Sequence, residues 1–339
     1  MKLDISVEER IVTGLFLCAD KPNEILGELK PEWNDKSDLS INEKLLIINP
    51  PAGPARSSLS IQNIFPWKDE LSHGIDHEEF CKSFFMQPDL FLRLRPGREK
   101  IVMQKLQHAK IDFAMISETC LSLPNSSKID EIIELDSEAV IQDYNSQQTG
   151  RFLGSALATR RNDKPMVWDC CAGSGGKSIM IYDIYPKAEL IVSDVRESIL
   201  SNLKKRFEKA GIKNYRSFIA DLTSEKSAIV NLKSEMIIAD VPCSGSGTWS
   251  RTPEQLYFFN EKEIEKFFIL QKKIVSKVIA QLQQGGTFVY ITCSVFKREN
   301  EDVVLYINEN FHLKLRQMEV LKGYDKKADS MFIAVFEKL

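Results

Sequence analysis

Residues 166–178 read MVWDCCAGSGGKS, and this stretch decides the fold. Its first three residues, Met166–Trp168, are apolar and typical of a buried strand, and Asp169 stands where that strand would end. Three glycines follow, at Gly173, Gly175 and Gly176. Glycine lets a ligand approach the backbone N–H groups at the start of a helix. The stretch therefore predicts a strand, a ligand-binding turn and a helix over residues 176–185.

The rest of the C-terminal half repeats strands and helices. Further strands are expected at Leu190–Ser193, Arg216–Ile219, Met236–Ala239, Thr287–Thr292, His312–Gln317 and Met331–Phe336, and helices at Ser198–Ala210, Glu261–Gln283 and Arg298–Asn310. Repeated strand–helix units predict a parallel sheet with helices on both faces. Such sheets bind ligands at the carboxyl ends of their strands, so the acids found there should surround one crevice. These acids are Asp169, Asp194, Asp221 and Asp240.

The N-terminal half has a different character, and we divide the chain into three parts. Residues 1–75 are expected to form a mostly helical accessory segment, with one helix at Val7–Cys18. Residues 76–140 suggest a small α+β domain, and residues 141–339 form the strand–helix domain. Within the small domain, strands are expected at Leu90–Leu94, Met115–Ile116 and Ile129–Leu135, and a helix at Arg98–His108.

Basic residues are concentrated in the small domain. They are Lys82, Arg93, Arg95, Arg98, Lys100, Lys105 and Lys110. Such a cluster is either a solvated face or a surface for phosphates. The whole chain has a net charge of −3, so any contact with nucleic acid must come from a local patch of this kind.

Composition excludes several classes of protein. No apolar run is long enough to span a membrane, and the first residues lack the apolar core of a signal peptide. Seven irregularly spaced cysteines then indicate reduced thiols in the cytoplasm. Because the chain has no CxxC pair and its four histidines are scattered, we expect no metal site.

The glycine turn alone admits more than one ligand. A phosphate-binding P-loop needs a glycine at position 171, which is Cys171, and a dinucleotide fingerprint needs one at position 178, which is Ser178. Asp194 lies about 20 residues after the turn, where an acid binds a ribose diol. That placement suits NAD and S-adenosylmethionine equally, so the later strands must decide.

Two later segments each place a thiol at the end of an expected strand. Residues 240–247 read DVPCSGSG, and residues 292–301 read TCSVFKRENE. Together with DCCAGSGGK, they closely resemble the RNA cytosine-5 methyltransferases of the Fmu/Sun/Nop type. The stretch around Gln142-Asp143 resembles the entry to that family's catalytic domain. The resemblance covers roughly residues 76–339. It departs from the family at Ser174, where a proline is usual.

The resemblance implies a Rossmann-like methyltransferase sheet, S-adenosylmethionine as methyl donor and RNA as partner. It makes Cys293 the thiol that attacks cytosine and Cys243 the thiol that assists product release. Asp240 would stabilise the adduct, with Lys177 as the nearest cation. The residues expected to bind the donor are Cys171, Ala172, Gly173, Ser174, Gly175, Gly176, Lys177, Asp194 (ribose), Arg196, Asp221 (adenine) and Asp240.

Some alternatives stay open at this point. The function expected first is C5 methylation of cytosine in ribosomal RNA, with transfer RNA as the other candidate substrate. A non-catalytic RNA-binding or ribosome-assembly protein on the same fold would share most of these features, and an NAD-dependent dehydrogenase would share the turn. Arg251 and Pro253 either contact RNA or cap a helix. The oligomeric state is not set by the sequence, and a monomer is compatible with it.

Overall fold

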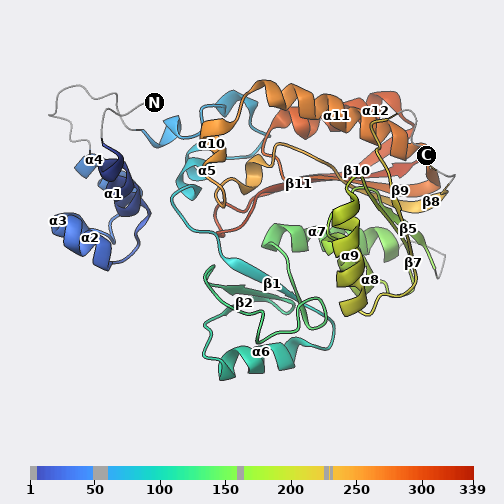
Figure 1. Ribbon diagram of the computed structural model, residues 1–339. Coiled ribbons are helices and arrows are strands. Elements are labelled where there is room, and N and C mark those ends of the chain that lie inside the picture. The colour runs from blue at the N-terminus through green and yellow to red at the C-terminus, as the bar shows by residue number, and fades with distance from the viewer. Residues whose placement is uncertain (1–5, 49–59, 159–163, 225–228, 230–231) are drawn as a thin grey trace.

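The computed structural model describes residues 6–48, 60–158, 164–224, 229 and 232–339, and contains two sheets (Figure 1). The larger sheet consists of β5 (Met166–Asp169), β6 (Glu189–Asp194), β7 (Tyr215–Ile219), β8 (Ser234–Asp240), β9 (Leu282–Thr292), β10 (Leu313–Leu321) and β11 (Met331–Lys338). Its strand order is β10-β11-β9-β8-β5-β6-β7. The fold is the expected Rossmann-like α/β sheet, and each strand expected in this half is present.

One strand of this sheet runs against the expected direction. The pairs from β9 through β8, β5 and β6 to β7 are parallel, but β11 is antiparallel to both β9 and β10. The expectation of an all-parallel sheet is therefore wrong at this edge. The reason is the connection: residues 322–330 join β10 directly to β11, whereas a parallel neighbour needs a longer crossover, usually with a helix.

Helices cover both faces of the larger sheet. They are α7 (Tyr144–Ala158), α8 (Gly176–Ile184) and α9 (Glu197–Lys209) on one face, and α11 (Lys262–Ile279) and α12 (Glu301–Asn310) on the other. The neighbours Ile237 and Ile238 on β8 belong to the two opposite cores, and both are fully buried. Burial of both faces explains why these strands read as continuous apolar runs.

The boundary between α11 and β9 differs from the expected one. The helix ends at Ile279, and the segment from Leu282 onward already belongs to the strand. The register shifts between Ser234↔Leu282 and Met236↔Thr287, so β9 carries extra residues there. Gly285 has a φ of 71°, a conformation that favours glycine, and the double glycine thus accommodates a bulge within the strand.

The smaller sheet consists of β1 (Leu90–Leu94), β2 (Ala114–Ser117), β3 (Cys120–Leu123) and β4 (Ala139–Ile141), in the order β2-β3-β1-β4. Helix α6 (Glu99–His108) packs on it through Val102 and Leu106. The expected strand at Ile129–Leu135 is wrong. Ile133 N–H donates to the carbonyl of Ile129 at 2.9 Å, so this segment turns, and both isoleucines reach the same core from four residues apart.

Two further groups of short elements precede this sheet. The first contains α1 (Val7–Cys18), α2 (Glu24–Leu29), α3 (Pro31–Asn34) and α4 (Ile41–Ile48); Figure 1 draws it apart from the sheets, and it has its own small core. The second contains α5 (His77–Ser83) and 3-10 turns at Ile61–Asn63 and Lys68–Glu70. It packs with α10 (Gln255–Phe258) and the 3-10 turns Ser246–Thr248 and Lys297–Glu299 near an aromatic cluster.

The aromatic cluster contains rings from both sides of the boundary expected at residue 75, such as Phe65 and Phe80. Phe65 lies 5.1 Å from Phe80 and 5.7 Å from Phe296 between ring centroids. The three-part division stays a prediction from the sequence. In the described part of the chain, no helix is both long and apolar enough to cross a membrane.

Candidate active site

The glycine turn joins β5 to α8 as expected. Gly173 and Gly175 have φ values of 52° and 87°, which side chains rarely adopt. A Cβ on Gly175 would also lie 2.9 Å from Phe207 and 3.0 Å from Leu203 of α9. Glycine is therefore required at Gly175 both by the backbone and by the close approach of α9. A Cβ on Gly176 would meet open space at the start of α8.

Asp194, at the end of β6, is tied to this turn. Its carboxylate accepts hydrogen bonds from the backbone N–H of Gly173 and from the backbone and side chain of Arg196, each at 3.0 Å. Burial would raise the pKa of Asp194, but the bonds from Arg196 and Gly173 outweigh it and lower that pKa below its ordinary value. Asp194 is thus held ionised beside the turn.

A cavity of about 710 Å³, called here the strand-end cavity, opens at the carboxyl ends of the parallel strands. Its polar lining includes Asp194, Arg196, Asp221 and Asp240, together with Cys171, Gly173 and Cys293. Thr223 donates to Asp221 from its backbone N–H at 2.9 Å and from its hydroxyl at 2.6 Å, and these bonds lower the pKa of that carboxyl. Three of the four acids expected to share one crevice therefore do so.

A second cavity, of about 400 Å³ and called the lysine cavity, adjoins the first and shares Cys171, Gly173, Asp240 and Cys293 with it. The other expected donor-binding residues of the turn line this second cavity: Ala172, Ser174, Gly176 and Lys177. Gly175 lines neither cavity, because its backbone packs under α9.

Asp169 also lines the lysine cavity, but only 2% of it is exposed. One carboxylate oxygen accepts a bond from the Ser178 hydroxyl at 2.6 Å, and the other has no partner among the described residues. Burial raises the pKa of Asp169 to about 7, and the nearby charge of Asp240 adds to the rise. The sequence could not distinguish this buried acid from the three that line the strand-end cavity.

Lys177 and Asp240 form an ion pair between the two cavities, with 2.6 Å between Nζ and Oδ2. The lysine side chain is only 9% exposed. Burial by itself would lower the pKa of Lys177, but the charge and hydrogen bond of Asp240 raise it above its ordinary value. Lys177 is therefore a fixed positive charge beside Cys293.

The two expected thiols meet. Cys243 follows β8, Cys293 follows β9, and their Sγ atoms are 3.3 Å apart. The hydrogen bond with Cys293, followed by burial, raises the pKa of Cys243 well above its ordinary value. Cys293 borders both cavities, whereas Cys243 borders only the strand-end cavity. Cys293 is thus the thiol that can act on one ligand while a second ligand lies next to it.

Glu299 connects the two thiol loops, a function that the sequence did not reveal. The side chain is fully buried. It accepts bonds at 2.8 Å from the backbone N–H of Ser244 and from the hydroxyl of Ser294, the residues that directly follow the thiols. Burial raises its pKa, against these hydrogen bonds. The expected motif contains Glu299, but only the structure shows that it holds both loops.

Arg251 is the centre of a second, partly buried network, at the edge of the lysine cavity. It contacts Asp329 at 2.7 Å, Asp143 at 2.9 Å and the carbonyl of Asp89 at 3.1 Å. Burial and the charge of Asp143 raise the pKa of Asp329 to about 6. Arg251 therefore joins three distant segments, and each of its three guanidinium nitrogens donates a hydrogen bond within the protein. Asp329 follows no recognisable motif, so no signal in the sequence points to it.

The basic cluster expected in the small domain is largely neutralised. Arg93 and Arg95 both bind Asp183 of α8, at 2.5 Å and 2.7 Å, and Lys105 binds Glu138 at 2.8 Å. Lys82 is paired as well, which leaves Arg98, Lys100 and Lys110 exposed. The interpretation of this cluster as one phosphate-binding face is wrong for its buried arginines, which hold the small sheet to helix α8 of the strand–helix domain.

Among the described residues, no group of three or more histidine, cysteine, aspartate or glutamate side chains could hold a metal ion. The strand-end cavity has carboxylates at three strand ends and a glycine-lined backbone edge, a set of groups that suits an organic cation with a ribose.

Known structures share this fold. The methyltransferase homolog protein from Pyrococcus horikoshii superposes with a TM-score of 0.65 at 20% identity, covering 80% of this chain and 92% of that one. NSun6 from Pyrococcus horikoshii, solved with the S-adenosylmethionine analogue SFG, gives 0.67 at 15% identity, with coverages of 82% and 96%. The fold is that of the Rossmann-like S-adenosylmethionine-dependent methyltransferases.

Within this class, the family profile described as 16S rRNA methyltransferase RsmB/F matches residues 155–335, more than half of the chain. The chain belongs to this family of RNA cytosine-5 methyltransferases. It is 29% identical over 168 residues to ribosomal RNA small subunit methyltransferase B of Proteus mirabilis. That match covers 48% of this chain and 37% of the relative, so it spans little more than a third of the relative's length.

Proposed function

We propose that the protein transfers a methyl group from S-adenosylmethionine to C5 of cytosine in ribosomal RNA, through a covalent adduct between Cys293 and C6 of the base. The observation that carries the proposal is the pair of thiols 3.3 Å apart, with Cys293 bordering both cavities. The strand-end cavity would hold the methyl donor and the lysine cavity the target base, which must leave any stack to enter.

The residues of the site fit the donor. Asp194 is an ionised acceptor at the end of β6, suited to a ribose diol, and Asp221 lies beside the adjoining strand end. Gly173 lines the strand-end cavity at the turn, and Arg196 orients Asp194. When bound, S-adenosylmethionine supplies an electrophilic methyl group on a sulfonium.

The thiols and the ion pair would carry the chemistry on the base. The Cys293 thiolate attacks C6, and its electrons make C5 nucleophilic enough to take the methyl group. Lys177 stabilises the thiolate beforehand, and Asp240 holds the edge of the base through a hydrogen bond. The C5 proton then passes to solvent water, the C5–H electrons re-form the C5–C6 double bond, and the S–C6 bond breaks to return the Cys293 thiolate. Cys243, hydrogen-bonded to Cys293, assists this last step.

The test is transfer of radioactive methyl from S-adenosylmethionine to a small-subunit ribosomal RNA transcript. The wild type should label the RNA, and Cys293→Ala should not. Cys243→Ala should instead accumulate a protein–RNA adduct that survives denaturing electrophoresis. Cys18→Ala, which removes an exposed thiol from α1, is the matched control and should behave as the wild type.

Full activity of Cys293→Ala would refute the covalent mechanism. RNA retention by the wild type without any methyl transfer would favour the non-catalytic RNA-binding alternative. Bisulfite sequencing of RNA from cells with and without the gene would identify the substrate: a lost signal in transfer RNA alone would replace ribosomal RNA in the proposal. The ribosomal assignment is supported by the name of the Proteus mirabilis relative.

A further inference from the structure

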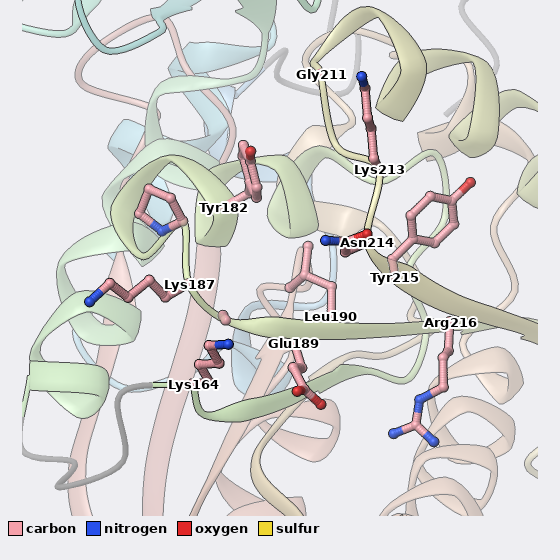
Figure 2. A pocket seen from close by; sticks show the side chains of 12 residues that line it. Lys164, Tyr182, Lys187, Glu189, Leu190, Gly211, Lys213, Asn214, Tyr215 and Arg216 are labelled. Atoms are coloured by element: carbon pink, nitrogen blue, oxygen red, sulfur yellow. The ribbon is translucent and has the colours of Figure 1, made fainter.

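A cleft of about 660 Å³ lies at the opposite edge of the large sheet, where β5, β6 and β7 begin. It is called here the basic cleft, and its charged lining is Lys164, Lys187, Lys213, Arg216 and Glu189 (Figure 2). Of the described residues that line it, Glu189 is the only acid. A chain with a net charge of −3 thus gathers four cations in one concave place.

Three of these cations are available to a ligand. Lys187, Lys213 and Arg216 are exposed, and none has an ion pair within the part of the chain that the structure describes. The guanidinium of Arg216 donates a weak hydrogen bond to the sulfur of Met166, at 3.4 Å. The small domain behaves differently, because Arg93, Arg95 and Lys105 are neutralised there.

The shape of the basic cleft indicates what kind of anion it suits. Figure 2 shows the basic side chains spread around the start of β6 and pointing in different directions. A single small anion needs donors that converge on one point, whereas a polyphosphate chain meets charges at several points. Tyr182, Asn214 and Tyr215 add neutral hydrogen-bonding groups along the lining. Contacts of this kind bind phosphates and sugars without reading sequence.

We propose that the basic cleft binds the phosphate backbone of the substrate RNA, away from the target cytosine. This inference rests on the proposed function, since it assigns a second contact to the same RNA. Strand β6 has six residues and separates the cleft from the strand-end cavity by roughly 20 Å. A structured RNA spans that distance, because a stacked strand covers it in about six nucleotides.

The test compares three proteins by fluorescence anisotropy with a labelled ribosomal RNA fragment, at several salt concentrations and without methyl donor. They are the wild type, the triple variant Lys187→Ala/Lys213→Ala/Arg216→Ala, and a control, Lys36→Ala/Lys314→Ala/Lys322→Ala, that removes the same charge from other exposed positions. Each phosphate contact contributes about 0.7–0.9 to the steepness with which log K for RNA falls against log salt concentration. At 0.1 M salt, the loss of one contact should therefore weaken binding roughly fivefold or more.

The triple variant should bind RNA at least tenfold more weakly than the control, with a slope lower by about 2. In methylation assays its KM for RNA should rise, while kcat and the Kd for S-adenosylmethionine stay at the wild-type values. Equal affinity and slope in all three proteins would overturn the assignment, as would an equal loss in the control. Failure of the wild type to methylate RNA would contradict the proposed function instead, and the binding result would still decide the cleft.

Discussion

Asp169 should make the stability of the catalytic sheet depend on pH, and Asp169→Asn should remove that dependence. Burial raises the pKa of this carboxyl from 3.8 to about 7. Between pH 3.8 and about 7, Asp169 is therefore protonated in the folded protein and ionised in the unfolded chain. Stability from this group is complete below pH 3.8 and is lost as the pH rises through about 7.

The magnitude follows from the shift. About three pKa units correspond to about 4 kcal/mol in total, and about 3 kcal/mol of this falls between pH 5 and pH 8. The amide that Asp169→Asn introduces cannot ionise, so the free energy of opening of the variant minus that of the wild type should rise by about 3 kcal/mol over this interval. Asp169→Asn should also destabilise the protein by an amount that does not vary with pH. The new amide N–H₂ replaces an oxygen that has no partner among the described residues, so its donors stay without a hydrogen bond.

Native-state hydrogen exchange of the β5 amides, corrected for intrinsic rates, measures this free energy of opening. Ser178→Ala provides one control: it removes the hydrogen bond that lowers the pKa of Asp169, so the loss should continue to higher pH. Asp221→Asn provides another. The pKa of Asp221 is lowered, so its titration lies below pH 5 and the difference should stay flat. A flat difference for Asp169→Asn would refute the reasoning.

Three further outcomes are expected. Arg206→Met should weaken S-adenosylmethionine binding about tenfold in calorimetry, because Arg206 donates hydrogen bonds to the carbonyl and hydroxyl of Ser174 at 3.0 Å and 2.9 Å. Adding Ser174→Pro to this variant should restore the affinity, because proline stiffens the turn. If the double variant binds as weakly as Arg206→Met alone, Arg206 does not act by holding the turn. Asp194→Asn should weaken the same binding by roughly 10- to 100-fold through loss of a charged acceptor, whereas an unchanged Kd would remove the ribose assignment. Glu299→Gln should let Cys243 react with iodoacetamide at lower pH than in the wild type, because the charge of Glu299 is one of the contributions that raise the pKa of Cys243. An unchanged pH dependence of the reaction rate would show that Glu299 does not affect the pKa of this thiol.

The parts of the site that could be predicted from sequence lie on single strands. An apolar run followed by an acid or a cysteine identifies a strand and its carboxyl end together, so Asp194, Asp240, Cys243 and Cys293 could be placed at one edge without knowing the strand order. Their convergence follows from the parallel arrangement of β5 to β9, and the distance of 3.3 Å between the thiols follows from the adjacency of β8 and β9.

The parts that could not be predicted depend on partners far away in the chain. Arg93 looks like a surface cation because its neighbours in sequence are basic, but its counter-ion, Asp183, follows 90 residues later. Arg251 meets Asp143 and Asp329, which are separated from it by 108 and 78 residues. A charge pattern read along the chain reports local repulsion and says nothing about such pairs. The turn at Ile129–Leu135 could not be predicted for a different reason. Ile129 and Ile133 pack into the same core, but they are four residues apart, which is a helical spacing and not a strand-like one.

These distant ion pairs tie the small sheet to the catalytic machinery. Asp183 lies on α8, the helix that begins at the glycine turn and carries Lys177. It forms ion pairs with Arg93 of β1 and with Arg95, which directly follows that strand. Removing one member of such a buried pair costs about 3–5 kcal/mol, since the remaining charge is left without a partner. These ion pairs therefore hold the small sheet against α8, the helix that also carries Lys177.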